Sequence, residues 1–255
     1  MDRQAGPISS ADEAFFAENG WLLLKGALPI DVATLSDWVD EVAEWADGGP
    51  GLHYREATDD GPKLCRSEDF TPSHDGLKAL LTSGIVAEVT SALLGEPAVL
   101  YKEKVNYKLV GGAGYAPHQD APAYPFLARH ISCMIAVDPA TEENGCLEVV
   151  SGMHHELLPQ DDRGCIDARI VEQLDWTPAP LDAGDVLWFH SRTPHRSGPN
   201  RSTKDRRALY PTYNARSEGD LRDDYYAAKQ AEIADADGQG RVVVSLIGDS
   251  QGRAV

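Results

Sequence analysis

Two segments of the 255-residue chain carry histidines and a carboxylate at spacings that suit a metal ion. His118 and Asp120 stand two residues apart, so on an extended backbone both side chains leave the same face. His195 follows a strand-like run and a polar loop. Two histidines and one carboxylate on one face of a metal leave its other positions open to further ligands. The alternatives at this point are a structural role for the first pair, a solvated loop histidine, and a zinc site.

A third segment carries two adjacent arginines, Arg206 and Arg207, at the start of another strand-like run. A guanidinium inside a barrel needs a carboxylate partner, because a buried unpaired charge is costly and arginine pairs with carboxylates through two hydrogen bonds. An organic acid bound at the metal would supply that partner. Strand alternation sends the two side chains to opposite faces, so only one of them can point into a barrel.

Basic residues alternate along the segment that precedes His118. Lys102, Lys104, Asn106 and Lys108 fall on one face of the predicted strand. This face is either an anion-binding surface inside the protein or a row of solvated lysines. The glycine-rich residues 111–114 that follow lack a Walker-type lysine and serine, so we interpret them as a connection to His118 and not as a phosphate loop.

Aromatic residues lie close in sequence to the metal motifs. Tyr115, Tyr124 and Trp188 could line a substrate pocket or form a cage around a quaternary ammonium group. The competing interpretation is that these side chains belong to the core.

Taken together and in this order, the segments resemble the phytanoyl-CoA dioxygenase family of iron and 2-oxoglutarate enzymes. The resemblance extends over about residues 15–213 and includes the His118-Gln119-Asp120 motif and the Asn144-Gly145-Cys146-Leu147 turn. It also includes the eleven-residue spacing from His195 to Arg206. The fold and the site residues of the family are therefore expected at the matching positions.

The resemblance implies that His118, Asp120 and His195 bind Fe(II). It implies that Arg206 forms a salt bridge with the distal carboxylate of 2-oxoglutarate, since the family spacing favours it over Arg207. Ser197 matches a family position that contacts the co-substrate, and we add Lys108 as a further co-substrate candidate. Oxygen is the second co-substrate.

The reaction implied is hydroxylation of an unactivated C–H bond, with release of succinate and CO2. Related halogenating enzymes have a small residue where this chain keeps Asp120, which favours hydroxylation. The segments 102–108 and 225–229 are similar to those of bacterial members that hydroxylate small aminoalkylphosphonates. Amino-acid derivatives and natural-product intermediates are the alternative substrates. The candidate substrate-binding residues are Lys104, Asn106, Lys108, Tyr115, Tyr124 and Trp188.

Three rival functions use the same residues. A cupin-like metalloenzyme without 2-oxoglutarate would make Arg206 merely structural, and a zinc hydrolase would use the same three ligands with an open water site. A non-catalytic metal-binding sensor is the third, and the intact set of His118, Asp120, His195 and Arg206 argues against it.

The elements that position these residues change character along the chain. Apolar spacing and turn signals predict helices over 10–19, 32–45 and 77–94, the last broken near Ser83-Gly84, and a strand over 21–25. Residues 51–75 are polar and rich in turn residues, which predicts a loop with at most one short strand. Short strands are expected at 99–109, 131–137, 147–150, 186–190 and 208–213, then a helix at 225–234 and a strand at 242–247.

Strands that follow one another without alternating helices exclude a parallel α/β sheet. We therefore expect an all-β core with flanking helices, folded as a double-stranded β-helix, the jelly-roll or cupin-like barrel. Residues 1–255 are expected to form a single domain. Its parts are a helical amino-terminal region of about 1–98, a jelly-roll core of about 99–215, and a carboxyl-terminal helix and strand over 216–255.

Charge excludes two classes of partner. The chain has 23 lysines and arginines against 41 acidic residues, a net charge of -18, which repels nucleic acids and anionic membranes. We expect a small-molecule substrate and a monomer or homodimer. The amino terminus lacks a signal-peptide pattern, and the four cysteines show no zinc or redox spacing, so we expect a cytoplasmic protein with reduced thiols.

Overall fold

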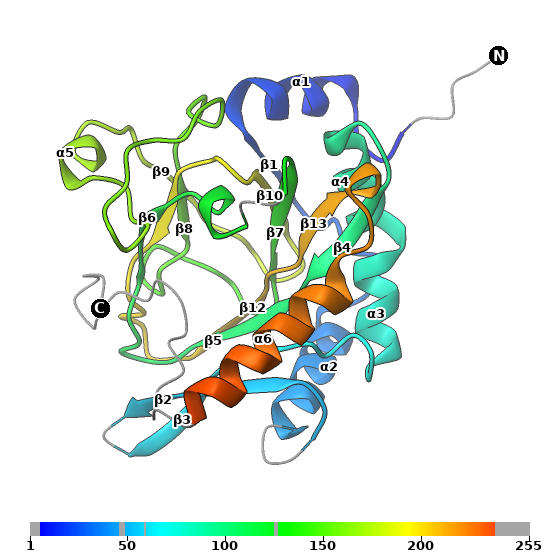
Figure 1. Ribbon diagram of the computed structural model, residues 1–255, viewed down its shortest axis with the longest axis vertical. Coiled ribbons are helices and arrows are strands. Elements are labelled where there is room, and N and C mark those ends of the chain that lie inside the picture. Colours follow the sequence, from blue (N-terminus) through cyan, green and yellow to red (C-terminus); the bar gives the residue numbers. More distant parts are fainter. Residues whose placement is uncertain (1–5, 46–48, 59, 125–126, 238–255) are drawn as a thin grey trace.

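Two antiparallel sheets face each other in a jelly roll, with helices packed on one side (Figure 1). The computed structural model describes residues 6–45, 49–58, 60–124 and 127–237. Along the larger sheet, the strands in spatial order are β1 (Trp21–Leu24), β10 (Val186–His190), β7 (His130–Ala136), β12 (Arg206–Leu209), β5 (Lys104–Lys108), β3 (Gly61–Glu68) and β2 (Leu52–Thr58). Beside this path β13 (Thr212–Ala215) pairs with both β7 and β4 (Ala98–Lys102).

The smaller sheet holds the strands that flank the metal motifs. Its order is β6 (Tyr115–His118), β11 (His195–Ser197), β8 (Leu147–Val149) and β9 (Thr177–Ala179). The helices are α1 (Ser10–Asn19), α2 (Val32–Glu44), α3 (Asp75–Thr82), α4 (Gly84–Leu94), α5 (Ala168–Val171) and α6 (Arg222–Asp237), with short 3-10 turns at Ala121–Ala123 and Arg216–Glu218.

Alternation along the strands divides the apolar side chains between two cores. One core packs α2, α3 and α4 on the outer face of the larger sheet and includes Leu35, Val105 and Trp188. The other core lies between the two sheets and includes Leu147 and Phe189. On β10, Trp188 and Phe189 are neighbours and therefore point to opposite faces. The inner face of β5 carries polar residues instead, so the space between the sheets is apolar on one side and charged on the other.

Helix ends follow their local chemistry. Ser9 caps α1 in a capping box with Asp12, and Gly20 ends the helix with φ at 79°. Asp31 caps α2 by accepting from the Thr34 amide. The stretch Asp75–Leu94 is long and apolar enough to cross a membrane by composition. It is a pair of core helices, because the backbone breaks at Ser83 and the apolar side chains pack into the first core.

The jelly roll and the first three helices agree with the sequence-based prediction, as does the break near Ser83. The prediction of a loop over 51–75 was wrong: β2 and β3 form a hairpin, and β3 pairs with β5. Pairing with a buried strand outweighs the polar composition of this segment. The predicted runs 99–109 and 208–213 each contain two strands. The predicted strand 242–247 lies outside the described residues.

Candidate active site

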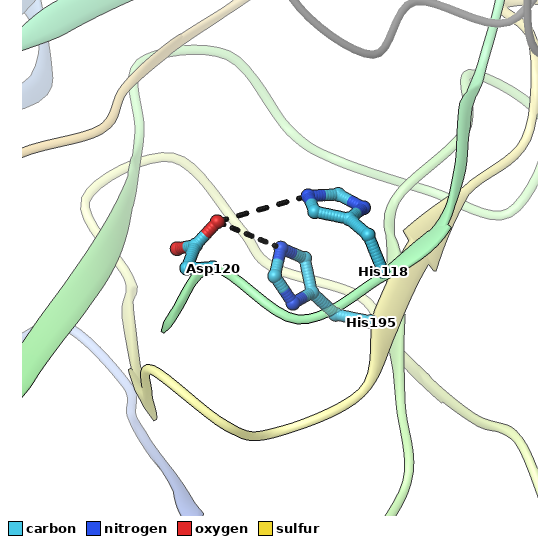
Figure 2. Close-up of side chains that lie close together, drawn as sticks. All are labelled: His118, Asp120 and His195. Carbon is cyan, nitrogen blue, oxygen red and sulfur yellow. Dashed lines mark ion pairs between the residues drawn. The ribbon is translucent and has the colours of Figure 1, made fainter. Parts of the chain in front are cut away.

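His118, Asp120 and His195 come together at the edge where β6 meets β11. His118 ends β6 and stands directly opposite His195, the first residue of β11. Asp120 follows β6 by two residues, and its Oδ1 lies 3.7 Å from Nε2 of His118 and 3.8 Å from Nε2 of His195 (Figure 2). One ligand atom from each residue lies within 4.8 Å of the others. Cross-strand pairing therefore brings together residues that are 75 or more positions apart.

Backbone carbonyls fix the orientation of both imidazoles. Nδ1 of His118 lies 2.7 Å from the Ala116 carbonyl, and Nδ1 of His195 lies 3.0 Å from the Thr193 carbonyl. A carbonyl oxygen only accepts, so each Nδ1 carries the proton and each Nε2 presents its lone pair towards Asp120. This is the tautomer that a metal ligand needs.

A hydrogen bond also fixes the orientation of the Asp120 carboxylate. Oδ2 of Asp120 accepts from the Ser132 hydroxyl at 2.9 Å, which leaves Oδ1 facing the imidazoles. Burial raises the pKa of Asp120, but His195 and His118 outweigh it and lower that pKa. Burial and His195 lower the pKa of His118 to about 3. Two imidazoles that turn their Nε2 atoms to one carboxylate fit a divalent transition metal such as iron(II).

The two adjacent arginines have opposite surroundings. Arg207 points outward, where it donates twice to Asp138 at 2.8 Å and once to Asp40 on α2. Arg206 points between the sheets and is only 2 % exposed. It donates to the Gly145 carbonyl at 3.0 Å and to the Tyr210 hydroxyl at 3.4 Å, and within the described residues its Nε has no partner. Of the two, Arg206 is the guanidinium that needs a carboxylate.

Lys108 stands directly opposite Arg206 on β5 and shares its acceptor. Nζ of Lys108 donates to the Gly145 carbonyl at 3.1 Å and to the Ser197 hydroxyl at 2.9 Å. Burial and the charge of Arg206 lower the pKa of Lys108 to about 6. Gly145 has φ at 72°, and a Cβ there would lie 2.6 Å from the lysine Nζ, so the turn requires glycine. Arg206, Lys108 and Ser197 thus form one cluster.

A second polar group continues along the inner faces of β3 and β5. Arg66 lies opposite Asn106 and donates to its side-chain oxygen at 3.1 Å and to the Tyr115 hydroxyl at 3.1 Å. Glu68 lies opposite Lys104. The cavity at the metal triad is lined on this side by Lys102, Lys104, Asn106 and Tyr115, and elsewhere by Leu147, Phe189, Tyr210 and Thr212. One wall, called the cationic wall below, therefore carries two lysine amines, and the other is apolar. Burial lowers the pKa of Lys104 well below its usual value, so a bound anion would stabilise its charged form.

Two aromatic candidates have roles that differ from the expectation. Trp188 is fully buried in the core under α4 and donates to the Thr90 hydroxyl at 3.0 Å, so it does not reach the cavity. Its neighbour Phe189 takes that place, because alternation turns it to the inner face. Tyr124 lies beside the site, with its hydroxyl hydrogen-bonded to the Lys102 amine.

The sequence-based interpretation also missed Arg66 and Glu68. Both lie in the segment predicted as a loop, where a charged residue carries no signal of burial. Strand alternation between Arg66 and Glu68 was the only available sign that they share a face. Arg66 is 3 % exposed and Glu68 is 3 % exposed.

Comparison with known proteins assigns the chain to a family. The family model for phytanoyl-CoA dioxygenase (PhyH) matches residues 16–208. A methylphosphonate hydroxylase from Gimesia maris is 47% identical over 88% of this chain and 87% of its own length. A 2-aminoethylphosphonate dioxygenase from an uncultured bacterium is 41% identical over 85% of each. The crystal structure of EctD from S. alaskensis superimposes with a TM-score of 0.72 at 20% identity, covering 86% of this chain and 80% of that one, which shows the shared fold.

Family, fold and donor set agree with one another. The structure of SnoN from nogalamycin biosynthesis in complex with Fe3+ and alpha-ketoglutarate is a further neighbour, with a TM-score of 0.66 at 22% identity over 80% of this chain and 82% of that one. This chain presents two histidines and an aspartate in one cluster inside the same jelly roll. It therefore belongs to the phytanoyl-CoA dioxygenase family and is an iron- and 2-oxoglutarate-dependent dioxygenase that acts on a small molecule.

Proposed function

We propose that this enzyme hydroxylates a C–H bond of a small alkylphosphonate, at the carbon next to phosphorus. The observation that carries the proposal is a cationic wall beside the metal triad in a protein whose net charge is -18. Lys102 and Lys104 line this wall, and pairing of β5 with β3 holds Lys104 in place. Buried cations need an anion, and the two relatives described above act on phosphonates by name.

His118, Asp120 and His195 would hold iron(II), which their Nε2 atoms and single free carboxylate oxygen fit. Iron bound there activates oxygen and couples the conversion of 2-oxoglutarate to succinate and CO2 to insertion of one oxygen atom into the substrate C–H bond. Ser132 keeps the carboxylate turned towards the imidazoles, and the two backbone carbonyls keep the rings in the binding tautomer.

Arg206, Lys108 and Ser197 would bind the distal carboxylate of 2-oxoglutarate. The unpartnered Nε of Arg206 supports this role, since a carboxylate would satisfy it. Lys108 adds a second cation and already contacts the Ser197 hydroxyl. We assign Lys108 to the co-substrate end and not to the substrate, because it lies opposite Arg206 and does not line the cavity at the triad.

Lys104, Asn106 and Tyr115 would bind the phosphonate oxygens. Arg66 supports two of them by donating to the Asn106 side chain and the Tyr115 hydroxyl. Leu147 and Phe189 form the apolar part of the cavity next to His195, so the carbon attached to phosphorus would face the metal. Tyr124 is left with a supporting role through its contact with Lys102.

The test measures succinate and hydroxylated product with the iron-loaded protein. Methylphosphonate should stimulate succinate formation, and phosphorus NMR should show a hydroxymethyl product. An anaerobic titration of iron(II) protein with 2-oxoglutarate should give a weak visible charge-transfer band that Asp120→Ala removes. Succinate formation that no phosphonate stimulates, together with preferential zinc binding, would contradict the proposal and favour a hydrolase.

We also propose that residues 1–255 act as one domain in the cytoplasm, as a monomer or homodimer, without nucleic acid or membrane partners. The four free cysteines and the strong negative charge support this setting. Size-exclusion chromatography with light scattering measures the oligomeric state directly.

A further inference from the structure

Glu68 is a buried carboxylate next to the cavity, beside the end of β5 that lies farther from Arg206. It ends β3 and stands directly opposite Lys104. Residues directly opposite each other in an antiparallel pair share a face, so Glu68 points between the sheets as Lys104 does. Because Lys104 lines the cavity at the metal triad, Glu68 is the carboxylate directly behind the proposed substrate end of the cavity.

Lys229, from α6, occupies the position beside this carboxylate. Its amine bonds Oε2 of Glu68 and donates to the Tyr225 hydroxyl at 3.3 Å. The same amine lies 5.4 Å from the ring centre of Tyr54 and 5.6 Å from that of Tyr225. A carboxylate flanked by aromatic rings is the surrounding that binds an alkylammonium group. The chain thus has a cation site and fills it with its own lysine.

The other oxygen of Glu68 is also committed. Nη1 of Arg66 lies 3.5 Å from Oε1 in a pair whose side chains are both 4 % exposed. Lys229 and Arg66 outweigh burial and lower the pKa of Glu68, so the carboxylate stays ionised. Among the described residues that line the cavity, the only carboxylate is Asp120, the proposed iron ligand. A positively charged substrate tail would find no free carboxylate among these described residues.

We propose that Lys229 selects the substrate by filling this cation site, so that the enzyme prefers small phosphonates whose tail is uncharged over aminoalkylphosphonates. The inference rests on the proposed function and specifies its substrate class. An ammonium carried into the cavity would lose its hydration and lie near Lys102, Lys104 and Lys229 without a partner, which is costly. An alkyl tail loses nothing there and gains apolar contact.

The selecting residue lies outside the part of the chain that defines the family. The family model ends at residue 208, whereas α6 begins at Arg222. Figure 1 shows α6 crossing the larger sheet beside β4 and the β2–β3 hairpin. Tyr226 anchors the helix by donating to the Glu103 carbonyl at 3.0 Å and accepting from the Asp69 amide at 3.3 Å. The catalytic core is common to the family, and α6 adds Lys229, the residue that would distinguish charged from uncharged substrate tails.

The test compares propylphosphonate with 2-aminoethylphosphonate, which have the same heavy-atom skeleton and differ by a methyl or an ammonium at the end. Each is measured as an inhibitor of methylphosphonate turnover by the iron-loaded full-length enzyme, so that binding is read whether or not the inhibitor is hydroxylated. The wild-type enzyme should bind propylphosphonate at least about tenfold more tightly, the scale set by an unpaired charge in a specificity pocket.

Three variants separate the cation site from general effects. Lys229→Met keeps the side-chain stem and should lower the preference for propylphosphonate by about tenfold. In Lys229→Met, Glu68 is free to bind the ammonium of 2-aminoethylphosphonate. Adding Glu68→Gln removes that carboxylate, so the double variant should bind 2-aminoethylphosphonate more weakly than Lys229→Met does. Lys25→Met is the matched control, since it removes an exposed lysine far from the cavity and should leave the preference unchanged.

The possible outcomes distinguish this inference from the proposed function. If no phosphonate is turned over, the proposed function fails and the inference falls with it. If 2-aminoethylphosphonate is turned over and methylphosphonate is not, the inference is overturned and the function stands. If methylphosphonate is turned over but the two inhibitors bind equally to the wild type, or neither binds, the inference is overturned and the function stands. That comparison uses only the wild-type enzyme, so it can overturn the inference even if the Lys229→Met protein does not fold. An unchanged preference in folded Lys229→Met overturns it as well.

Discussion

The two ends of β5 treat buried charge in opposite ways. At one end Lys108 and Arg206 lie side by side, and within the described residues no carboxylate pairs with either of them. At the other end Glu68 is paired on both oxygens by Arg66 and Lys229. Uncompensated charge inside a protein is costly and persists where a ligand supplies the opposite charge. The first end therefore calls for a ligand carboxylate, and the second leaves no place for a ligand cation.

The largest expected effect comes from removing Arg206, at the end of β5 where no carboxylate of the described residues pairs with the buried cations. Arg206→Met should weaken 2-oxoglutarate binding about a hundredfold or more, because the ligand carboxylate would then be buried with one cation fewer. The charge-transfer titration measures this affinity, and iron affinity should stay unchanged. Arg207→Met is the control, since Arg207 already pairs with Asp138 and points away from the cavity. Equal losses in the two variants would show that Arg206 does not bind the co-substrate.

A smaller effect is expected at the cationic wall between the two ends. Lys104→Met should raise KM for methylphosphonate about thirtyfold through loss of a buried charge pair, with little change in 2-oxoglutarate affinity. Steady-state kinetics with each substrate varied in turn provides the measurement. A rise confined to the KM for 2-oxoglutarate would instead show that Lys104 binds the co-substrate.

Protonation of Lys108 gives a pH dependence with a definite sign. In the free protein the pKa of Lys108 is lowered to about 6, so the amine is neutral above that pH. A bound carboxylate stabilises the ammonium, so binding takes up a proton, and 2-oxoglutarate affinity should rise as pH falls from 8 towards 6 and level off below. The slope is at most about tenfold per pH unit for one proton.

Calorimetric titration in buffers of different ionisation enthalpy measures the proton uptake directly. Lys108→Met should bind 2-oxoglutarate more weakly and without this slope. A wild-type affinity that is flat between pH 8 and pH 6 would mean that the lysine does not pair with the co-substrate.

The smallest expected effect concerns Trp188 on β10, which was expected in the substrate site and lies in the core instead. Trp188→Phe should cost about 1 kcal/mol of unfolding free energy through the lost hydrogen bond to Thr90, and kcat/KM should stay within about twofold of the wild type. Chemical denaturation and steady-state kinetics measure the two quantities. A large loss of kcat/KM without loss of stability would show that Trp188 does contribute to the substrate site.

Local spacing was enough to predict much of the site. His118 and Asp120 were expected on one face because they stand two residues apart, whereas the choice of Arg206 over Arg207 came from the spacing in the family that the chain resembles. Helix periodicity predicted α2, α3 and α4, which bury three or four residues each, and turn signals predicted α1, which buries only Phe16. The hairpin over residues 52–68 was missed, since its strands are stabilised by pairing with β5 and not by their own composition.

The sequence by itself determined which residues could share a face, because alternation and helical period follow from backbone geometry. Only the tertiary structure decided which face became the inside. Apolar residues cover both faces of β10, so neither Trp188 nor Phe189 is marked as inward until helices pack on one side and the second sheet on the other. The same holds for α6, whose Lys229 reaches Glu68 across 161 residues through a packing contact that no local pattern encodes.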